Sequence, residues 1–233
     1  FHRLEYQTVG SLEEPTAASG VLMVPTGAAP ACSGPRPIVV YAHGTSTDKG
    51  YNLAAVTDAD NAAFTEGLMV AAVFAAQGYI VVAPNYVGYD MSTLDHHPYL
   101  NADQQSKDMI DALAAARKSL GAVAASSTTD DGRLYLTGYS QGGHVAMATQ
   151  RAMQAAGQTV TASAPMSGPY ALLAFLDRIV FGEVNLGATL FMPMATTAWQ
   201  KAYGNLYSDP SETYEATYAT GIETLLPSTT PID

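Results

Sequence analysis

The chain has 233 residues, 48% of them hydrophobic, which is enough for one α/β domain with a single core. Ten Lys and Arg against 21 Asp and Glu give a net charge of −11, so a polyanion would be repelled and we expect no nucleic-acid partner. No apolar run is long enough to cross a bilayer. The sequence has no cluster of metal-ligating residues and no Gly-rich loop with a Lys, so we expect no metal and no phosphate cofactor.

The first 45 residues predict strands that end in a functional loop. Alternation around residues 21–24 predicts one or two antiparallel edge strands before a Pro-rich loop that extends to Pro37. Residues 38–42 form a continuous apolar run, which is typical of a strand buried on both faces of a parallel sheet. His43-Gly44-Thr45 follows directly, so we expect this tripeptide at the carboxyl edge of the sheet.

Two helices and a second buried strand are predicted next. Asn61 can cap a helix that Gly78 ends, and its apolar positions share one face: Phe64, Leu68, Met69, Ala72, Val73 and Ala76. Residues 79–83 read as a buried strand closed by Pro84. Asn101 and Gln104 resemble a capping box for a helix with a core face of Met109, Ile110, Leu113, Ala116 and Leu120.

Residues 133–136 and 159–165 supply a third and a fourth central strand. This alternation of strands and helices predicts an α/β fold with a doubly wound, mostly parallel sheet over residues 1–170. From residue 171 to 233 the pattern changes to short apolar and aromatic helical pieces without a following strand. We expect a helical lid or cap there, and ordinary helical packing is the alternative.

Gly138-Tyr139-Ser140-Gln141-Gly142 lies between the third strand and a helical run. A serine at such a sharp turn has a strained backbone and an exposed hydroxyl, and the flanking glycines remove side chains that would clash. The pattern therefore predicts a nucleophile elbow with Ser140 as the nucleophile. The backbone N–H of Gln141 begins the helix and is one expected oxyanion donor, and the N–H of Thr45, or alternatively of Gly44, is the second.

Five blocks of sequence in this order resemble the α/β-hydrolase superfamily, and within it the secretory lipases and bacterial lipase-like esterases: residues 41–45, 83–89, 97–100, 138–144 and 164–170. The resemblance spans roughly residues 37 to 170. It implies ester hydrolysis through an acyl-enzyme, a helical lid after the fourth strand, and a triad acid and histidine further along the chain.

The sequence departs from that pattern at the triad. The order in this fold is Ser, then Asp or Glu, then His, but the only histidine after Ser140 is His144, which we expect to point into the core from the elbow helix. Either the enzyme uses an irregular base, or the chain lacks the C-terminal strands and the acid and histidine belong to a C-terminal fragment, present as a second polypeptide. We favour the second explanation, which also offers a partner for the single cysteine, Cys32.

The sequence thus predicts a carboxylic ester hydrolase that is secreted or periplasmic, since the chain begins at Phe1 without a leader, is acidic and contains few lysines. A small-molecule or lipid ester is the expected substrate, with transient contact to a lipid interface. Alternatives are a serine peptidase or acyltransferase on the same fold, and a binding protein that has lost its triad. Candidates for the acyl pocket are Tyr86, Tyr89, Phe175, Met192 and Trp199.

Overall fold

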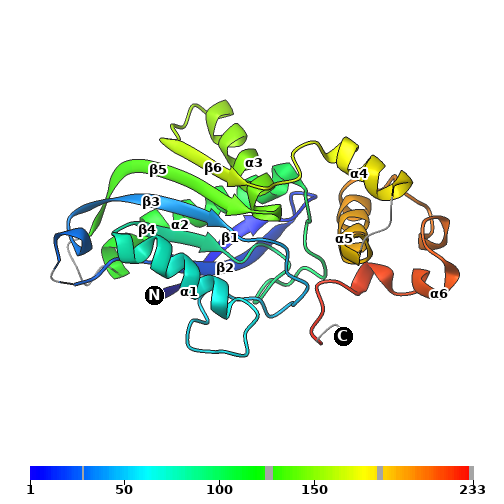
Figure 1. The fold of residues 1–233 in the computed structure, drawn as a ribbon, viewed down its shortest axis with the longest axis horizontal. Coiled ribbons are helices and arrows are strands. Elements are labelled where there is room, and N and C mark those ends of the chain that lie inside the picture. Colours follow the sequence, from blue (N-terminus) through cyan, green and yellow to red (C-terminus); the bar gives the residue numbers. More distant parts are fainter. Residues whose placement is uncertain (28, 124–127, 183–185, 231–233) are drawn as a thin grey trace.

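A computed structural model describes residues 1–27, 29–123, 128–182 and 186–230 (Figure 1). Its centre is a six-stranded sheet in the order β1-β2-β4-β3-β5-β6. Strands β3 to β6 run parallel, whereas β1 and β2 are antiparallel additions at one side. The strands are β1 (His2–Val9), β2 (Pro15–Met23), β3 (Pro35–Ala42), β4 (Ile80–Pro84), β5 (Thr129–Tyr139) and β6 (Ala162–Met166).

Helices lie on both faces of the sheet, as the predicted doubly wound α/β class requires (Figure 1). Helices α2 and α3 pack against each other and against the strands, and α1 lies on the opposite face. The helices are α1 (Phe64–Val73), α2 (Ala102–Val123), α3 (Gln141–Ala155), α4 (Leu172–Phe181), α5 (Leu186–Tyr203) and α6 (Ala216–Ala219), with 3₁₀ turns at Pro30–Cys32, Ala75–Gln77, Pro210–Glu212 and Ile222–Thr224.

The two central strands are buried on both faces, as their uninterrupted apolar sequences predict. Ile38–Ala42 of β3 and all of β4 are inaccessible to solvent or nearly so. Helix α2 also confirms its predicted face: Met109, Leu113, Ala116 and Leu120 are buried, and Ile110 is partly buried against the core. The Asn101 side chain accepts the N–H of Gln104 at 3.1 Å and so caps α2, although the Gln104 side chain bonds to Val9 O instead of completing the box.

Helix α1 buries a different face from the expected one. Its buried residues are Gly67 and Val70, while Leu68, Met69 and Val73 are 42 to 49% exposed. A Cβ on Gly67 would lie 3.0 Å from Leu53 O, so the helix approaches the 51–56 loop through this glycine. The expectation that the Leu68 and Val73 face packs into the core is therefore wrong for the described part of the chain. Asn61 also lies before the helix, and the N-cap is Ala63.

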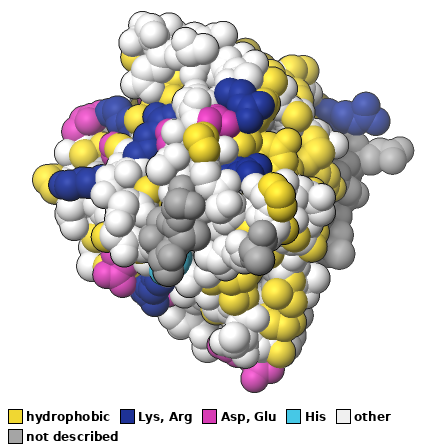
Figure 2. All heavy atoms as spheres, turned by 90° about the vertical axis from the view of Figure 1, so that its left-hand side faces the viewer, with side chains coloured by type: hydrophobic (Ala, Val, Ile, Leu, Met, Phe, Trp, Pro, Cys, Tyr) yellow, Lys and Arg dark blue, Asp and Glu magenta, His cyan; other side chains and the backbone are white. Residues whose placement is uncertain are grey.

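A broad apolar surface remains uncovered beside α1. Among the described residues, strand β6 pairs only with β5, and it is exposed at alternate residues from Ala162 to Met166, unlike the buried strands at the centre. Seen from the left-hand end of Figure 1, hydrophobic side chains gather over the side of the molecule that carries α1 (Figure 2). The parallel side of the sheet therefore ends in an exposed apolar surface. Covering this surface with another segment or partner would stabilise the protein.

The segment after residue 170 forms a separate helical layer beyond the carboxyl ends of the strands (Figure 1). It has a small core of its own, in which Met194, Ala195 and Ala198 of α5 pack with Tyr99 and Leu100 of the main domain. Helix α4 has no buried residue. The layer thus rests on the 99–100 loop and leaves α4 over the end of the sheet.

Candidate active site

Ser140 lies at the turn between β5 and α3 with φ 56° and ψ −121°, a conformation that a non-glycine residue rarely adopts. The turn is held because the Ser140 N–H donates to Met166 O of β6 at 3.0 Å and the Ser140 carbonyl accepts the N–H of Gly143 at 2.9 Å. Ser140 is half-buried, and its hydroxyl makes no hydrogen bond to any described residue. Backbone strain of this kind, over-determined by its surroundings, is typical of a nucleophile elbow.

Three glycines make the elbow sterically possible. A Cβ on Gly138 would lie 2.4 Å from Gly142 O, one on Gly142 would lie 1.9 Å from Ala42 O, and one on Gly143 would lie 2.4 Å from Met166 O. Each of these contacts is with backbone, which cannot move aside as a flexible side chain can. The glycine spacing in the sequence therefore reflects close packing of α3 against the ends of β3 and β6.

The predicted oxyanion donors lie next to Ser140. A Cβ on Gly44 would be 3.9 Å from the Ser140 Cβ, and both Gly44 and Thr45 share a cavity wall with Ser140. Within the described part of the chain, the backbone N–H groups of Thr45 and Gln141 donate to no protein acceptor. The Gln141 N–H is also at the positive end of the α3 dipole. Two unpaired donors beside a serine hydroxyl can stabilise the negative charge of a tetrahedral intermediate.

The loop that carries Gly44 and Thr45 rests on a buried histidine. His43 is stacked between the rings of Tyr51 and Tyr86, at centroid distances of 4.4 and 4.1 Å. Its Nδ1 lies 2.6 Å from Gly44 O and its Nε2 lies 3.1 Å from Asn85 O. Burial lowers the pKa of His43, so a neutral ring donates to one of these two carbonyls. The ring therefore supports the loop, as expected from the sequence.

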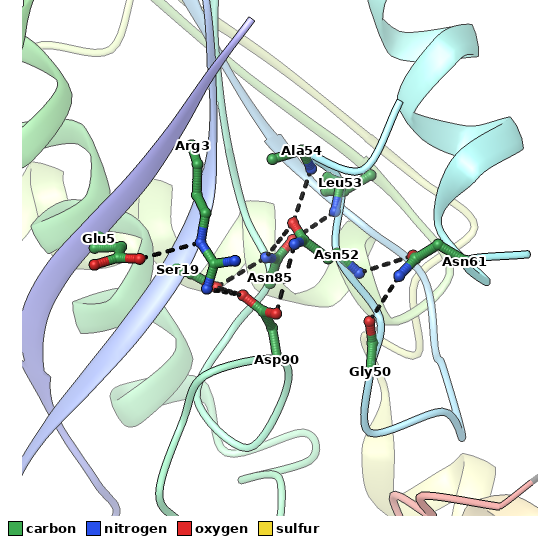
Figure 3. Close-up of polar contacts among 10 residues, drawn as sticks. All are labelled: Arg3, Glu5, Ser19, Gly50, Asn52, Leu53, Ala54, Asn61, Asn85 and Asp90. Carbon is green, nitrogen blue, oxygen red and sulfur yellow. Dashed lines mark hydrogen bonds and ion pairs between the residues drawn. The ribbon is translucent and has the colours of Figure 1, made fainter. Parts of the chain in front are cut away.

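Asn85 connects this support to the neighbouring loop through a polar network (Figure 3). Its side-chain oxygen accepts the Leu53 N–H at 2.8 Å, and its amide donates to Ser19 Oγ at 2.9 Å. Ser19 in turn donates to Asp90, whose carboxylate also pairs with Arg3 at 2.8 Å. The network attaches the 50–61 loop to the middle of β2 and to the residue after β4, whose carbonyl contacts His43 (Figure 3 shows the network).

A cavity of about 160 Å³ lies between the elbow and the helical layer. Its walls are mostly apolar, and they bring Phe175 and Met192 to the same space as Ser140 and Gln141. The other three pocket candidates do not line it: Tyr86 and Tyr89 are completely buried around His43 and His97, and Trp199 packs in the core of the helical layer. The expectation for Tyr86 and Tyr89 is corrected because their hydroxyls turn inward to His43 O and Ser46 O.

A larger cavity of about 790 Å³ opens on the other side of Ser140. It lies between α1 and the exposed strand β6, with Met69 and Val73 on one wall and Ala164 and Met166 on the other. Glu66 also faces it and accepts hydrogen bonds from the hydroxyls of Tyr41 and Tyr51 at 2.6 and 2.5 Å. Ser140 is thus shared between a small apolar cavity and a wide open one.

None of the five histidines lies where it can act as the base for Ser140. His43 and His97 are buried with both ring nitrogens directed at other residues and not at Ser140, and His2 is on β1 at the far edge of the sheet. His96 pairs with Asp95 and lines neither cavity beside Ser140. His144 is 9% exposed, interacts with the Pro169 backbone, and has a pKa lowered by burial. The base is therefore missing from the described part of the chain.

Two residues near the site were not singled out as site residues from the sequence. The Nε2 of His97 lies 2.6 Å from the Gln141 amide nitrogen, and the Tyr99 hydroxyl lies 2.9 Å from Thr45 Oγ1. Both contacts join segments 44 or more residues apart, so periodicity could not reveal them. The signals in the sequence were the 97–100 block of the family resemblance and its place in a loop expected at the carboxyl edge of the sheet.

The described residues contain no helix long and apolar enough to span a membrane. They also contain no group of three or more His, Cys, Asp or Glu that could hold a metal ion. Cys32 is half-buried and forms no disulfide in this part of the protein.

A strained serine after a central parallel strand, with unpaired backbone donors on either side of it, defines the site of an α/β-hydrolase. The comparisons with known proteins agree. Residues 66–179 match the prolyl oligopeptidase family. The structure is similar to the rice cell wall degrading esterase LipA from Xanthomonas oryzae, with 36% sequence identity over 98% of this chain and a TM-score of 0.85. The chain belongs to the α/β-hydrolase superfamily.

Candida antarctica lipase A shares the fold, with a TM-score of 0.67 over 96% of this chain and 15% identity. The chain spans 58% of the length of the LipA chain and 49% of that of the Candida lipase. A search of curated proteins found no match.

Proposed function

We propose that this protein is a carboxylic ester hydrolase of the lipase or esterase type, acting through an acyl-enzyme on Ser140. The observation that carries the proposal is the elbow itself, with a strained serine and two unpaired N–H groups beside it. The likeness to the Xanthomonas esterase at 36% identity supports the ester as the substrate class. As for the setting, the acidic, lysine-poor composition favours a secreted or periplasmic protein.

The reaction follows from the positions of these groups. Ser140 Oγ attacks the ester carbonyl while a base removes its proton, and the carbonyl oxygen becomes an oxyanion that accepts hydrogen bonds from Thr45 and Gln141. The carbonyl re-forms, the bond to the alcohol oxygen breaks, and the alcohol leaves with the proton that the base returns. Water then attacks the acyl-enzyme through the same steps and releases the acid and free Ser140.

The acid and the histidine are proposed to come from polypeptide outside the 233 residues, either a continuation or a second chain. The absence of a usable base among the described residues supports this, as does the shorter span relative to the esterase. The exposed strand β6 and the apolar wall of α1 face the open cavity beside Ser140. A strand added to the free edge of β6 would cover this wall and bring side chains to the serine.

The small cavity is proposed to hold the acyl group, since it is apolar and starts at Ser140. Helix α4 over it exposes Leu173, Val180 and Phe181 by 58 to 84%, which supports transient contact with a lipid interface. Phe175→Trp should shift the preferred p-nitrophenyl ester to shorter acyl chains. Phe181→Trp, on the same helix but outside the cavity, should leave the preference unchanged; equal preferences in both variants would contradict the assignment.

Labelling with a fluorophosphonate probe tests the proposed function, because only an activated serine reacts. We expect labelling of the native protein at Ser140, hydrolysis of p-nitrophenyl esters, and loss of both in Ser140→Ala by about 10⁴-fold or more. An unlabelled native protein would instead indicate a binding protein that has lost its triad.

Intact-mass measurement tests the origin of the base. A single active species of 24.4 kDa would contradict the proposal that the base lies outside the 233 residues.

A peptidase is the second candidate, because residues 66–179 match the prolyl oligopeptidase family. The elbow and oxyanion donors serve amide and ester substrates alike, and also acyl transfer to other alcohols. Comparing kcat/KM for p-nitrophenyl esters with that for aminoacyl amides separates the two. Faster turnover of the amides would favour the peptidase.

A further inference from the structure

The loop between β4 and α2 contains a tight turn that contacts both sides of the oxyanion hole. The Tyr99 N–H donates to His97 O at 2.7 Å across Pro98, so His97 and Tyr99 project from one rigid turn. Both side chains are nearly inaccessible to solvent. The His97 side chain contacts Gln141, the residue after the proposed nucleophile, and the Tyr99 side chain contacts Thr45 in the loop after β3.

The hydrogen-bonding role of each His97 nitrogen follows from its partners. Nδ1 lies 2.7 Å from Val87 O, which can only accept, so Nδ1 carries the proton. Nε2 is therefore an acceptor, and it receives the Gln141 amide at 2.6 Å. The Gln105 amide of α2 approaches the same atom at 3.2 Å. Burial lowers the pKa of His97 to about 3, so this pattern of donor and acceptor persists at neutral pH.

Among the described residues, this contact is the only hydrogen bond of the Gln141 side chain. Gln141 is 1% exposed, its amide nitrogen bonds to His97, and its carbonyl oxygen has no partner within the described residues. Because the Gln141 Cα also bears the backbone N–H expected to face the oxyanion, the anchored side chain limits rotation of that N–H. On the opposite side, the Tyr99 hydroxyl bonds to Thr45 Oγ1 at 2.9 Å and holds the residue with the second expected donor.

We propose that His97 and Tyr99 are positioning residues that hold the two oxyanion donors, through the Gln141 side chain and the Thr45 hydroxyl respectively. The inference rests on the proposed function. Hydrogen bonds to an oxyanion are stronger in the transition state than in the bound ester, so loosening the donors lowers kcat and leaves KM little changed. Binding of a boronic acid that forms a tetrahedral adduct with Ser140 weakens in parallel.

The experiment compares ester turnover by the active native protein with that of four variants. His97→Phe keeps a ring but removes the acceptor, and Gln141→Met breaks the same contact from the other side; each should lower kcat about 10- to 100-fold, within the range for disturbing one oxyanion donor. His97→Gln can place a side-chain oxygen near the former Nε2 and should restore kcat to within about fivefold of the native value. Tyr99→Phe should lower kcat about three- to tenfold, because only the Thr45 side is loosened.

Two matched controls separate positioning from packing. Gln105→Met removes the other amide beside His97, and Tyr79→Phe removes a hydroxyl far from the elbow; both should keep native kcat and boronate affinity. The combined His97→Phe, Gln141→Met variant should be no slower than the slower single variant, since both remove one contact. In the combined His97→Phe, Tyr99→Phe variant, the fold losses of kcat should multiply, since each substitution loosens a different donor.

The inference is overturned if His97→Phe and Gln141→Met both retain kcat within twofold, or if their losses leave boronate affinity unchanged. Should His97→Phe fail to fold, Gln141→Met alone decides in the same way. A native protein without ester turnover overturns the proposed function and this inference with it. Native turnover with unaffected variants overturns the positioning role only.

Discussion

The two sides of Ser140 differ in how completely they are built. Toward β4, the turn at residues 97–99, His43 and Asn85 form a buried set in which almost every polar group has a partner. Toward β6, the same serine opens on exposed methionine and valine side chains and an unpaired strand edge. In the proposed function, this chain therefore supplies the groups that stabilise charge, whereas the group that moves the proton is expected from another part of the protein.

The largest expected effect tests the closed side. Gly142→Ala should destabilise the protein by more than about 4 kcal/mol, because its Cβ would lie 1.9 Å from a backbone oxygen of β3. Gly121→Ala, in α2 with nothing within 4 Å of the added Cβ, should instead stabilise by up to about 1 kcal/mol. Urea unfolding followed by circular dichroism measures both. A soluble Gly142→Ala variant of native stability would show that the elbow has room for a Cβ at this position.

Helix α1 contains a buried and an exposed valine three positions apart, so it allows the covered and the uncovered side to be compared. Val70 is completely buried and Val73 is 49% exposed on the uncovered face. Val70→Ala should lower the free energy of unfolding of this chain by about 2 to 3 kcal/mol, and Val73→Ala should change it by less than about 0.5 kcal/mol. Equal losses measured on the 233-residue chain would mean that the Val73 face is already covered. In a protein completed by the proposed further polypeptide, the Val73 loss should grow.

A pH dependence of stability is expected from His97, on the closed side of Ser140. Its pKa is about 3 in the folded protein, below the 6.5 of an exposed histidine, so the unfolded chain takes up the proton first as the pH falls. The stabilisation is therefore complete above pH 6.5 and decreases progressively toward pH 3. Between pH 7 and pH 5 the native protein should lose about 2 kcal/mol more than His97→Gln, which has no such group.

Urea midpoints of the two proteins at pH 7, 6 and 5 measure this difference. The remaining histidines are common to both proteins and cancel in the comparison. Parallel pH curves would mean that His97 is not buried as a neutral acceptor.

Features set by near neighbours in the chain were predictable. The strand, the glycine spacing and the helix around Ser140 are encoded within about ten residues, so the elbow and the position of Gln141 at the start of the helix could be predicted without coordinates. Apolar runs also predicted β3 and β4, since a strand buried on both faces leaves no polar alternation. The predictions that were wrong concern the direction of side chains whose neighbours come from segments distant in the sequence.

Tyr86 and Tyr89 show why. Aromatic residues in a loop at the carboxyl edge of a sheet can face a pocket or the core, and here their hydroxyls find partners in the 43–46 segment. Periodicity likewise identified an apolar stripe on α1 but could not indicate that Gly67 and Val70 would be the buried side. In both cases the neighbour that decides the orientation is distant in sequence.

The class of sheet and the positions of the proposed nucleophile and of one proposed oxyanion donor could be found from the sequence, because they depend on local backbone geometry and on hydrophobic pattern. Only the tertiary structure decided that the 97–99 turn meets both Gln141 and Thr45, and that an apolar wall beside β6 stays uncovered. Contacts of this kind depend on how loops 40 or more residues apart come together around a common core, and side-chain chemistry at a single position does not specify its partner.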